Sequence, residues 1–272
     1  MRPTVFRDGL FDGQVALVSG GGTGIGRVIA TLFARLGARV AICGRREGPL
    51  RETAGTIEHA LGTETLVRPM SIRERDQVDA LVAEVWDRWG RLDHLVNNAG
   101  GQFPTPSIDL EDRGWRAVVD TNLNGTWYMM QAAARRWRDE GHPGSIVNIV
   151  LNTERGTPQV VHSGAARAGV VCATRTVSTE WAPYGIRANC VSAGAIETEG
   201  HGVYPAEAAA RFRDSNPMRR MGESLDVAEA VAYLSGPSGS FLTGVVLTVD
   251  GGQHQWGDLW PSGMPGHFRL DH

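Results

Sequence analysis

Residues 15–26 read V-A-L-V-S-G-G-G-T-G-I-G, a short apolar run followed by a glycine-rich loop. Glycines at positions 20, 24 and 26 allow a tight turn and let the backbone approach a pyrophosphate, whose charge then faces the N-terminus of a following helix. We expect that helix to begin at about Arg27. The order of strand, loop and helix therefore predicts a phosphate-binding turn rather than an ordinary surface turn.

The alternation of strand and helix continues along the chain. Short apolar runs alternate with longer amphipathic patterns, such as those over residues 73–89 and 115–137. Near-continuous apolar strands separated by helices indicate a parallel sheet that is covered on both faces. We therefore predict an α/β Rossmann fold, a doubly wound parallel seven-stranded sheet in a single domain. The expected strands span residues 15–19, 39–43, 65–68, 94–97, 145–150, 187–191 and 245–249.

The domain is expected to occupy residues 1–252 of the 272-residue chain, whose 42% hydrophobic content can supply a full core. The irregular segment 195–221 follows the sixth expected strand and is predicted to cover the substrate. Residues 253–272 form a tail with three large aromatic side chains among glycine and proline. We expect this tail to dock onto its own domain or onto a neighbouring subunit.

Composition narrows the classes of partner. The formal net charge is −3, so neither nucleic acid nor an anionic membrane surface is an expected partner. No apolar run reaches the length of a membrane span and the N-terminus lacks the apolar stretch of a signal peptide, which favours a cytoplasmic location. Cys43, Cys172 and Cys190 are isolated in apolar segments, so packing is expected rather than a disulfide or a metal site.

Two motifs together, G-x-x-x-G-x-G at 20–26 and N-N-A-G at 97–100, resemble the short-chain dehydrogenase/reductase superfamily over about residues 10–252. In that superfamily N-N-A-G ends the fourth strand beneath the adenine ribose, and a threonine matching Thr198 holds the nicotinamide amide. The resemblance thus implies a nicotinamide dinucleotide and a homo-oligomer, most simply a homotetramer. The residues implied to bind the cofactor are Ser19, Gly20, Gly24, Ile25, Gly26, Asn98, Ala99, Gly100, Gly194, Ile196 and Thr198.

Cofactor choice depends on the end of the second strand, where an acidic side chain would bind the ribose 2′-hydroxyl of NAD. This chain has Gly44-Arg45-Arg46 there. Glycine leaves room for a 2′-phosphate, and guanidinium groups suit a phosphate through charge-assisted hydrogen bonds. We therefore predict NADP(H) rather than a solvated arginine pair. Ser71, where many relatives have an adenine-contacting aspartate, is a further expected contact.

The expected catalytic helix lacks the usual side chains. Laid on the superfamily pattern, V-H-S-G-A-A-R-A-G-V at 161–170 places Ser163 at the tyrosine position and Arg167 at the lysine position. The usual serine position is apolar, and only Asn122 of the four-residue Asn-Ser-Tyr-Lys set is present. A plain alcohol dehydrogenase that uses the tyrosine mechanism is therefore disfavoured.

Longer motifs resemble the trans-2-enoyl-CoA reductase and 2,4-dienoyl-CoA reductase branch of the superfamily. These are N-N-A-G-G-Q-F at 97–103, T-N-L-N-G-T-W-Y-M at 121–129 and H-S-G-A-A-R-A-G-V at 162–170. Enzymes of this branch reduce a C=C bond conjugated to a thioester, and arginine at the lysine position is normal in its enoyl group. Hydride adds to the β-carbon, so the thioester oxygen becomes an enolate that needs hydrogen-bond donors. A proton must then reach the α-carbon from a side chain or an ordered water.

The acid positions of that branch are also changed in this chain. One acid stands fifteen residues before the Lys/Arg position, here Asn152, and another four residues after it, here Val171. Asn152 and Ser163 are predicted to donate to an enolate oxygen. Arg167 is predicted to hold the nicotinamide ribose and lend positive potential, although the chain contains no lysine anywhere, so composition is an alternative reason for this arginine. Asn122, Asn152, Ser163 and Arg167 form the predicted catalytic set.

Other candidates remain open beside this set. His162 titrates in the right range for an acid but suits a capping or packing role equally well, and Tyr204 is a more distant acid. The arginines at 211, 213, 219 and 220 suit the phosphates of CoA or a solvated helix face.

Three functions compete at this point. The first is an NADPH-dependent reductase of an activated C=C bond, a trans-2-enoyl or dienoyl CoA thioester. The second is a carbonyl reductase or alcohol dehydrogenase acting on an apolar aldehyde or alcohol. The third is a non-catalytic NADP(H)-binding sensor or scaffold, which the missing acid suggests.

Overall fold

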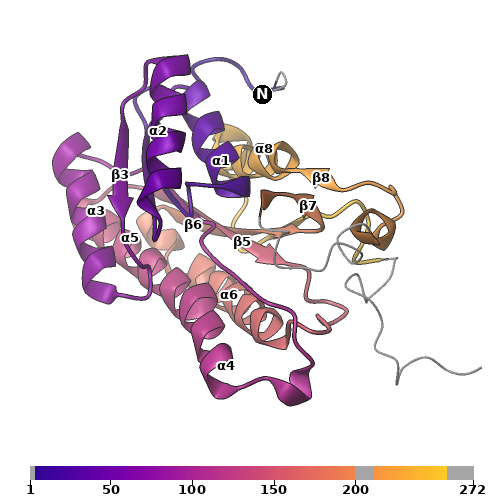
Figure 1. Cartoon of the computed structure of the whole chain (residues 1–272). Coiled ribbons are helices and arrows are strands. Elements are labelled where there is room, and N and C mark those ends of the chain that lie inside the picture. Colours follow the sequence, from indigo (N-terminus) through magenta and orange to yellow (C-terminus); the bar gives the residue numbers. More distant parts are fainter. Residues whose placement is uncertain (1–3, 200–210, 256–272) are drawn as a thin grey trace, which may run out of the picture.

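A computed structural model describes residues 4–199 and 211–255 of the chain (Figure 1). Tyr204, the middle of the segment 195–221 and most of the tail 253–272 therefore lie outside the described residues. No helix in the described part of the chain is long and apolar enough to cross a membrane.

The centre of the fold is one seven-stranded sheet in the order β3-β2-β1-β4-β5-β6-β9, in which all neighbouring strands are parallel. This confirms the predicted doubly wound sheet, and each strand lies within two residues of its expected bounds. The strands are β1 (Val15–Ser19), β2 (Arg39–Gly44), β3 (Thr65–Pro69), β4 (His94–Asn97), β5 (Gly144–Leu151), β6 (Ile186–Ala193) and β9 (Val246–Val249).

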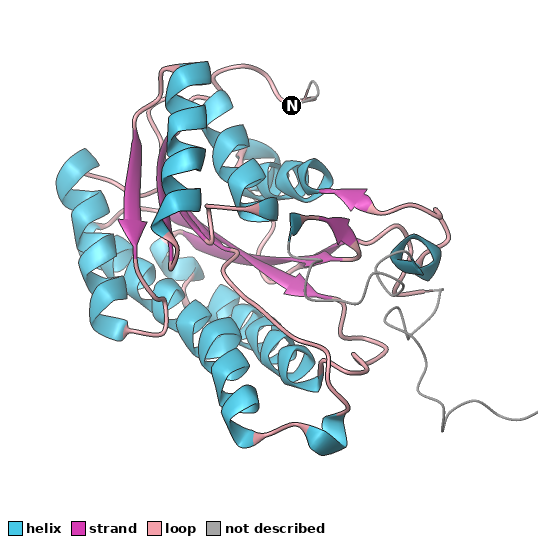
Figure 2. Ribbon diagram, viewed as in Figure 1, coloured by secondary structure: helices cyan, strands magenta, loops and turns pink. Residues whose placement is uncertain are grey.

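Helices cover both faces of the sheet (Figure 2). One face carries α1 (Gly24–Arg35), α2 (Glu47–Leu61) and α8 (Ser224–Ser235), and the other carries α3 (Arg75–Trp89), α4 (Asp112–Val119), α5 (Thr126–Glu140) and α6 (Val161–Glu180). Single 3₁₀ turns span Ser107–Asp109, Ala182–Tyr184, Phe212–Ser215 and Pro237–Gly239. A two-stranded parallel ladder pairs β7 (Ile196–Glu197), near the start of segment 195–221, with β8 (Gly222–Glu223), which directly follows that segment.

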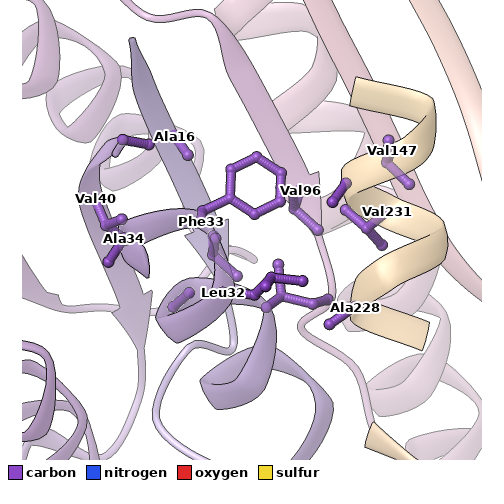
Figure 3. Packing of buried hydrophobic residues seen from close by; sticks show 14 of the residues in the cluster. Ala16, Leu32, Phe33, Ala34, Val40, Val96, Val147, Ala228 and Val231 are labelled. Atoms are coloured by element: carbon purple, nitrogen blue, oxygen red, sulfur yellow. The ribbon is translucent and has the colours of Figure 1, made fainter. Parts of the chain in front are cut away.

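The two cores follow from the twofold period of a strand. All five residues of β1 are buried, and Ala16 and Val18 face one core while Val15 and Leu17 face the other. Figure 3 shows the first core, where Phe33 of α1 lies among side chains of the sheet and of α8. Truncating such a side chain typically costs about 3–5 kcal/mol.

Two helices differ from the sequence prediction. Helix α1 begins at Gly24 rather than at about Arg27, because the backbone N–H of Arg27 already donates to the Thr23 carbonyl at 3.2 Å. The pattern over 115–137 is not one helix: α4 gives way to a π-helical turn, Asp120–Gly125, before α5 begins. The wider turn changes which carbonyls are bonded within the helix without changing its apolar face, so periodicity alone cannot reveal it.

Candidate active site

The glycine-rich loop is held against the end of β4. Gly20 has a φ of +68°, and a Cβ there would lie 2.8 Å from Asn98 Nδ2 and clash with the Ala99 backbone. Asn98 Nδ2 donates to the carbonyls of Ser19 and Gly20 at 3.2 Å, while Ser19 Oγ accepts from the backbone N–H groups of Asn98 and Ala99 at 3.1 Å. A Cβ on Gly26 would collide with the Gly20 carbonyl. The loop therefore needs glycine for close backbone packing.

A cavity of about 150 Å³ opens beside this loop at the carboxyl ends of β1, β2 and β4. This is the switch point of the strand order, where open α/β sheets bind dinucleotides. Six of the predicted cofactor residues line it, namely Gly20, Arg45, Arg46, Ser71, Ala99 and Gly100. The shape, the loop amides and the basic lining suit an adenosine phosphate.

The cavity also contains a cation that the sequence analysis missed. Arg73 lines it and is fixed by hydrogen bonds to Thr121 Oγ1 at 2.6 Å and to the Ala117 carbonyl at 2.5 Å. Arg45 and Arg46, by contrast, are exposed, and neither forms an ion pair with a described residue. Arg73 lies within an apparent helical pattern, and no local signal points to its contact with a residue 48 positions away.

A carboxylate lies at the start of α1. Glu199 Oε2 accepts from the Gly24 backbone N–H at 3.0 Å, and its Oε1 lies 3.8 Å from Arg27 Nη1. A Cβ on Gly24 would come within 3.3 Å of Thr198, so these two predicted cofactor residues are neighbours in space. The helix N-terminus thus binds an anion in this structure, as its free N–H groups and dipole favour.

Several predicted cofactor residues also have structural contacts. Ile25 packs partly buried against the first core, and Ile196 is buried on β7. Gly194 lies against β9, since a Cβ there would be 2.7 Å from Asp250 Cα. Ser71 accepts from the Arg73 backbone N–H at 3.3 Å.

Three of the four predicted catalytic residues form one buried cluster. Asn122 sits in the π-helical turn, where its Nδ2 donates to Ser163 Oγ at 3.2 Å and its side chain exchanges two 3.0 Å hydrogen bonds with the Gly101 backbone. Ser163 and Arg167 lie one turn apart on α6. Arg167 donates to the carbonyls of Asn122 at 3.3 Å and Ala99 at 3.4 Å. The Asn122 carbonyl also accepts from Thr126 Oγ1 at 2.9 Å.

Arg167 is a buried cation with no carboxylate partner among the described residues. Burial lowers the pKa of Arg167 to about 10, so the guanidinium stays charged at neutral pH. Its Nη2 lies where a Cβ on Gly100 would have to be, so glycine at position 100 makes room for it. The cluster therefore combines a positive charge with neutral hydrogen-bond donors, an arrangement that stabilises a developing oxyanion.

The fourth predicted catalytic residue, Asn152, contacts Asp250. Its Nδ2 donates to Asp250 Oδ2 at 3.3 Å and its Oδ1 accepts from the Glu154 backbone N–H at 3.1 Å. No described hydrogen bond joins it to Ser163 or Arg167. His162 is fully buried with its ring edge-on to Phe103 at 4.6 Å, and burial lowers its pKa. That direction disfavours the protonated His162 required of an acid.

A family profile described as enoyl-(acyl carrier protein) reductase matches residues 20–254. The chain belongs to the short-chain dehydrogenase/reductase superfamily. It is an oxidoreductase of that superfamily, and the fold implies a nicotinamide cofactor.

The curated relatives are similar along nearly their whole length. A probable 2,4-dienoyl-CoA reductase of Bacillus subtilis is 37% identical, with 91% of this chain and 98% of that protein covered. The peroxisomal 2,4-dienoyl-CoA reductase of Rattus norvegicus is 36% identical over 91% of this chain and 86% of its own length.

Solved structures give the same family with other names. A citronellol catabolism dehydrogenase of Pseudomonas aeruginosa has a TM-score of 0.81 at 36% identity, covering 93% of this chain and 99% of that one. Levodione reductase has a TM-score of 0.86 at 30% identity, covering 90% and 99%.

Proposed function

We propose that this protein is an NADPH-dependent reductase of the activated C=C bond of a trans-2-enoyl or dienoyl CoA thioester. The supporting observation is the buried cluster of Asn122, Ser163 and Arg167, which offers a charge and hydrogen-bond donors without a phenol. We infer that Ser163 and Arg167 replace the tyrosine and lysine of the superfamily. Relatives at 36–37% identity named 2,4-dienoyl-CoA reductases support this substrate class.

Conjugate reduction assigns a distinct task to each residue. A bound nicotinamide supplies the hydride. Ser163 Oγ accepts from Asn122, which leaves its own proton to donate to the thioester oxygen as negative charge develops there. Arg167 holds the nicotinamide ribose and contributes positive potential at neutral pH. Asn152 supports the site through Asp250.

The choice of NADP(H) rests on three arginines at the adenosine cavity. Arg45 and Arg46 are available for a 2′-phosphate, Arg73 lines the same cavity, and Gly44 adds no side chain. Replacing Arg45 and Arg46 with alanine should weaken NADPH binding roughly tenfold or more, since a hydrogen bond to a charged group contributes about 1.5–3 kcal/mol, and should leave NADH binding nearly unchanged. Fluorescence titration with both nucleotides measures this difference, and an equal loss for both would contradict a 2′-phosphate site.

The decisive experiment measures NADPH consumption and identifies the product, with trans-2-enoyl-CoA and 2,4-dienoyl-CoA thioesters supplied beside aldehydes of matched chain length. Reduced acyl-CoA product is the expected result, and Ser163→Ala should lower its rate while His59→Gln, an exposed substitution on α2, should not. Alcohol formed from the aldehydes alone would favour the carbonyl reductase, which the likeness to a citronellol catabolism dehydrogenase supports. Tight NADPH binding without turnover would favour a sensor.

We also propose a cytoplasmic homotetramer that associates through α4 to α5 and α6. Trp115 on α4 and Val161 on α6 are each 38% exposed, and we infer that these two apolar side chains lie in the interface.

A further inference from the structure

A second buried polar group lies at the carboxyl edge of the sheet. Asp250 follows β9, and its side chain is only 3% exposed. Its Oδ1 accepts from the Gly252 backbone N–H at 2.8 Å, and its Oδ2 accepts from the His254 backbone N–H at 2.7 Å and from Asn152 Nδ2. The carboxylate is therefore held in one orientation by donors on both oxygens.

The remaining partner of this carboxylate is an imidazole. His254 Nδ1 lies 2.8 Å from Asp250 Oδ2. A carboxylate accepts hydrogen bonds, so Nδ1 carries the proton and Asp250 fixes both the tautomer and the ring plane. The other ring nitrogen, Nε2, has no hydrogen bond to a described residue, and the side chain is 22% exposed. Nε2 is thus the free end of an oriented carboxylate–histidine pair.

The pair lies on the edge of the sheet where the reaction site is found. Leu151, Ala193 and Val249 are in register at the ends of β5, β6 and β9, so Asn152, Gly194 and Asp250 follow three adjacent strands. A Cβ at position 194 would collide with Asp250, so glycine at this position leaves room for Asp250. Asp250 can therefore reach Asn152 across the intervening strand.

The pair also borders an open space. A cavity of about 450 Å³ lies between this edge and the β7–β8 ladder, and it is lined by His254 and Asp250 together with Asn216, Met218 and Arg220. Its lining combines apolar surface with the Arg220–Asp226 ion pair and Asp250, and we expect the apolar part to hold the acyl chain of a thioester.

We propose that His254 is the catalytic acid of this enzyme and that Asp250 is its positioning residue, an inference that rests on the proposed reduction. After hydride reaches the conjugated chain, the π electrons move onto the thioester as an enolate. The Nε2–H bond of the His254 imidazolium breaks, a C–H bond forms at the α-carbon, and neutral imidazole remains. Solvent then returns a proton to the ring. The α-carbon takes the proton when an enoyl thioester is reduced, and also when a dienoyl thioester is reduced to a 3-enoyl product.

The test separates loss of an acid from loss of structure. His254→Asn retains a donor for Asp250 but removes the ring, and His254→Ala leaves a space that free imidazole can fill. Both variants should lose about 10²-fold or more in kcat on the thioester that the wild type reduces. Their NADPH dissociation constants should stay within twofold of wild type, and imidazole should restore the His254→Ala rate at least tenfold.

Asp250→Asn and His59→Gln are the matched controls. Asp250→Asn should lower kcat without any rescue by imidazole, because the ring is still present but no longer oriented. His59→Gln should behave as wild type. A kcat within threefold of wild type in both His254 variants, or a loss that imidazole does not restore, overturns the assignment. A wild type that reduces no thioester overturns the proposed function and this assignment together, whereas an active wild type isolates the role of His254.

Discussion

The position of Arg167 depends on the missing side chain of Gly100. Because the guanidinium occupies the space of a Cβ on Gly100, Gly100→Ala should push Arg167 away from the Ala99 and Asn122 carbonyls. The displaced group is the far end of a flexible side chain, so the melting temperature should change little. Losing a preorganised charge should lower kcat/KM roughly 10²-fold.

Steady-state kinetics and thermal unfolding measure these two effects separately. Gly48→Ala is the control, because a Cβ at that position meets nothing within 4 Å. Unchanged kinetics in Gly100→Ala would remove Arg167 from the site.

His94 makes stability depend on pH. Its Nε2 contacts Gln14 Oε1 at 2.6 Å, its Nδ1 is buried without a partner in the described structure, and its ring packs on Phe11 and Phe33. Desolvation by burial lowers its pKa from 6.5 to about 4, against the opposing field of Asp93 and alongside the charges of Arg187 and Arg91. Between these pH values the unfolded chain binds more protons than the native one, so stability falls as pH falls.

The expected loss of unfolding free energy between pH 6.5 and 4 is on the order of 3 kcal/mol. Denaturant unfolding at a series of pH values measures it. In His94→Gln the loss of unfolding free energy over that pH range should be smaller by about this amount. An unchanged loss would show that another group is responsible.

The sequence predicted that Asn122, Ser163 and Arg167 belong to the site, and these residues do lie together. It did not predict Asp250 or His254, because the hydrogen bond that joins Asp250 to Asn152 spans 98 residues and leaves no local pattern. Asn152 was predicted to act with Ser163 because it stands fifteen residues before Arg167, at an acid position of the resembled branch, but its described hydrogen bonds go to Asp250 and Glu154.

At the scale of elements, the N-terminus of α1 offers one anion position, for which Glu199, in the segment after β7, competes with a cofactor phosphate. Glu199 occupies the Gly24 amide that a cofactor phosphate would need. Glu199→Gln should therefore strengthen NADPH binding by roughly two- to fivefold, since an anion at a helix N-terminus contributes about 0.3–1 kcal/mol.

Titration of NADPH fluorescence at low and high salt checks this expectation. The gain should shrink as salt screens the competing charge. Glu52→Gln, which also removes a carboxylate near Arg27 but does not contact Gly24, is the matched control. Weaker binding in Glu199→Gln would mean that this carboxylate supports the loop instead of competing with the cofactor.

Elements with strong periodicity were predictable and those with irregular backbone were not. The seven strands follow from runs of buried apolar residues. Helix ends also obey local rules, as at Gly90, whose φ of +68° ends α3. The π turn over 120–125 keeps the spacing of an ordinary helix, so only its hydrogen bonds distinguish it.

For the whole molecule, the proposed tetramer predicts a light-scattering mass four times that of the chain. Trp115→Glu and Val161→Glu should each reduce this mass, because a charge cannot be buried in an apolar interface without cost. Tyr233→Glu, at an equally exposed position on α8, should leave the mass unchanged. A wild type with the mass of one chain would exclude the assembly.

The two halves of the reaction site become available at different times during synthesis. Every residue that lines the dinucleotide cavity lies between Gly20 and Thr121, whereas Asp250 comes with the edge strand β9. Ribosomes release chains from the N-terminus, and structure forms in that order. A growing polypeptide therefore holds the lining of the dinucleotide cavity long before it has Arg167 or the carboxylate that accepts from Asn152, so a prematurely terminated chain would carry part of the nucleotide site without the complete reaction site.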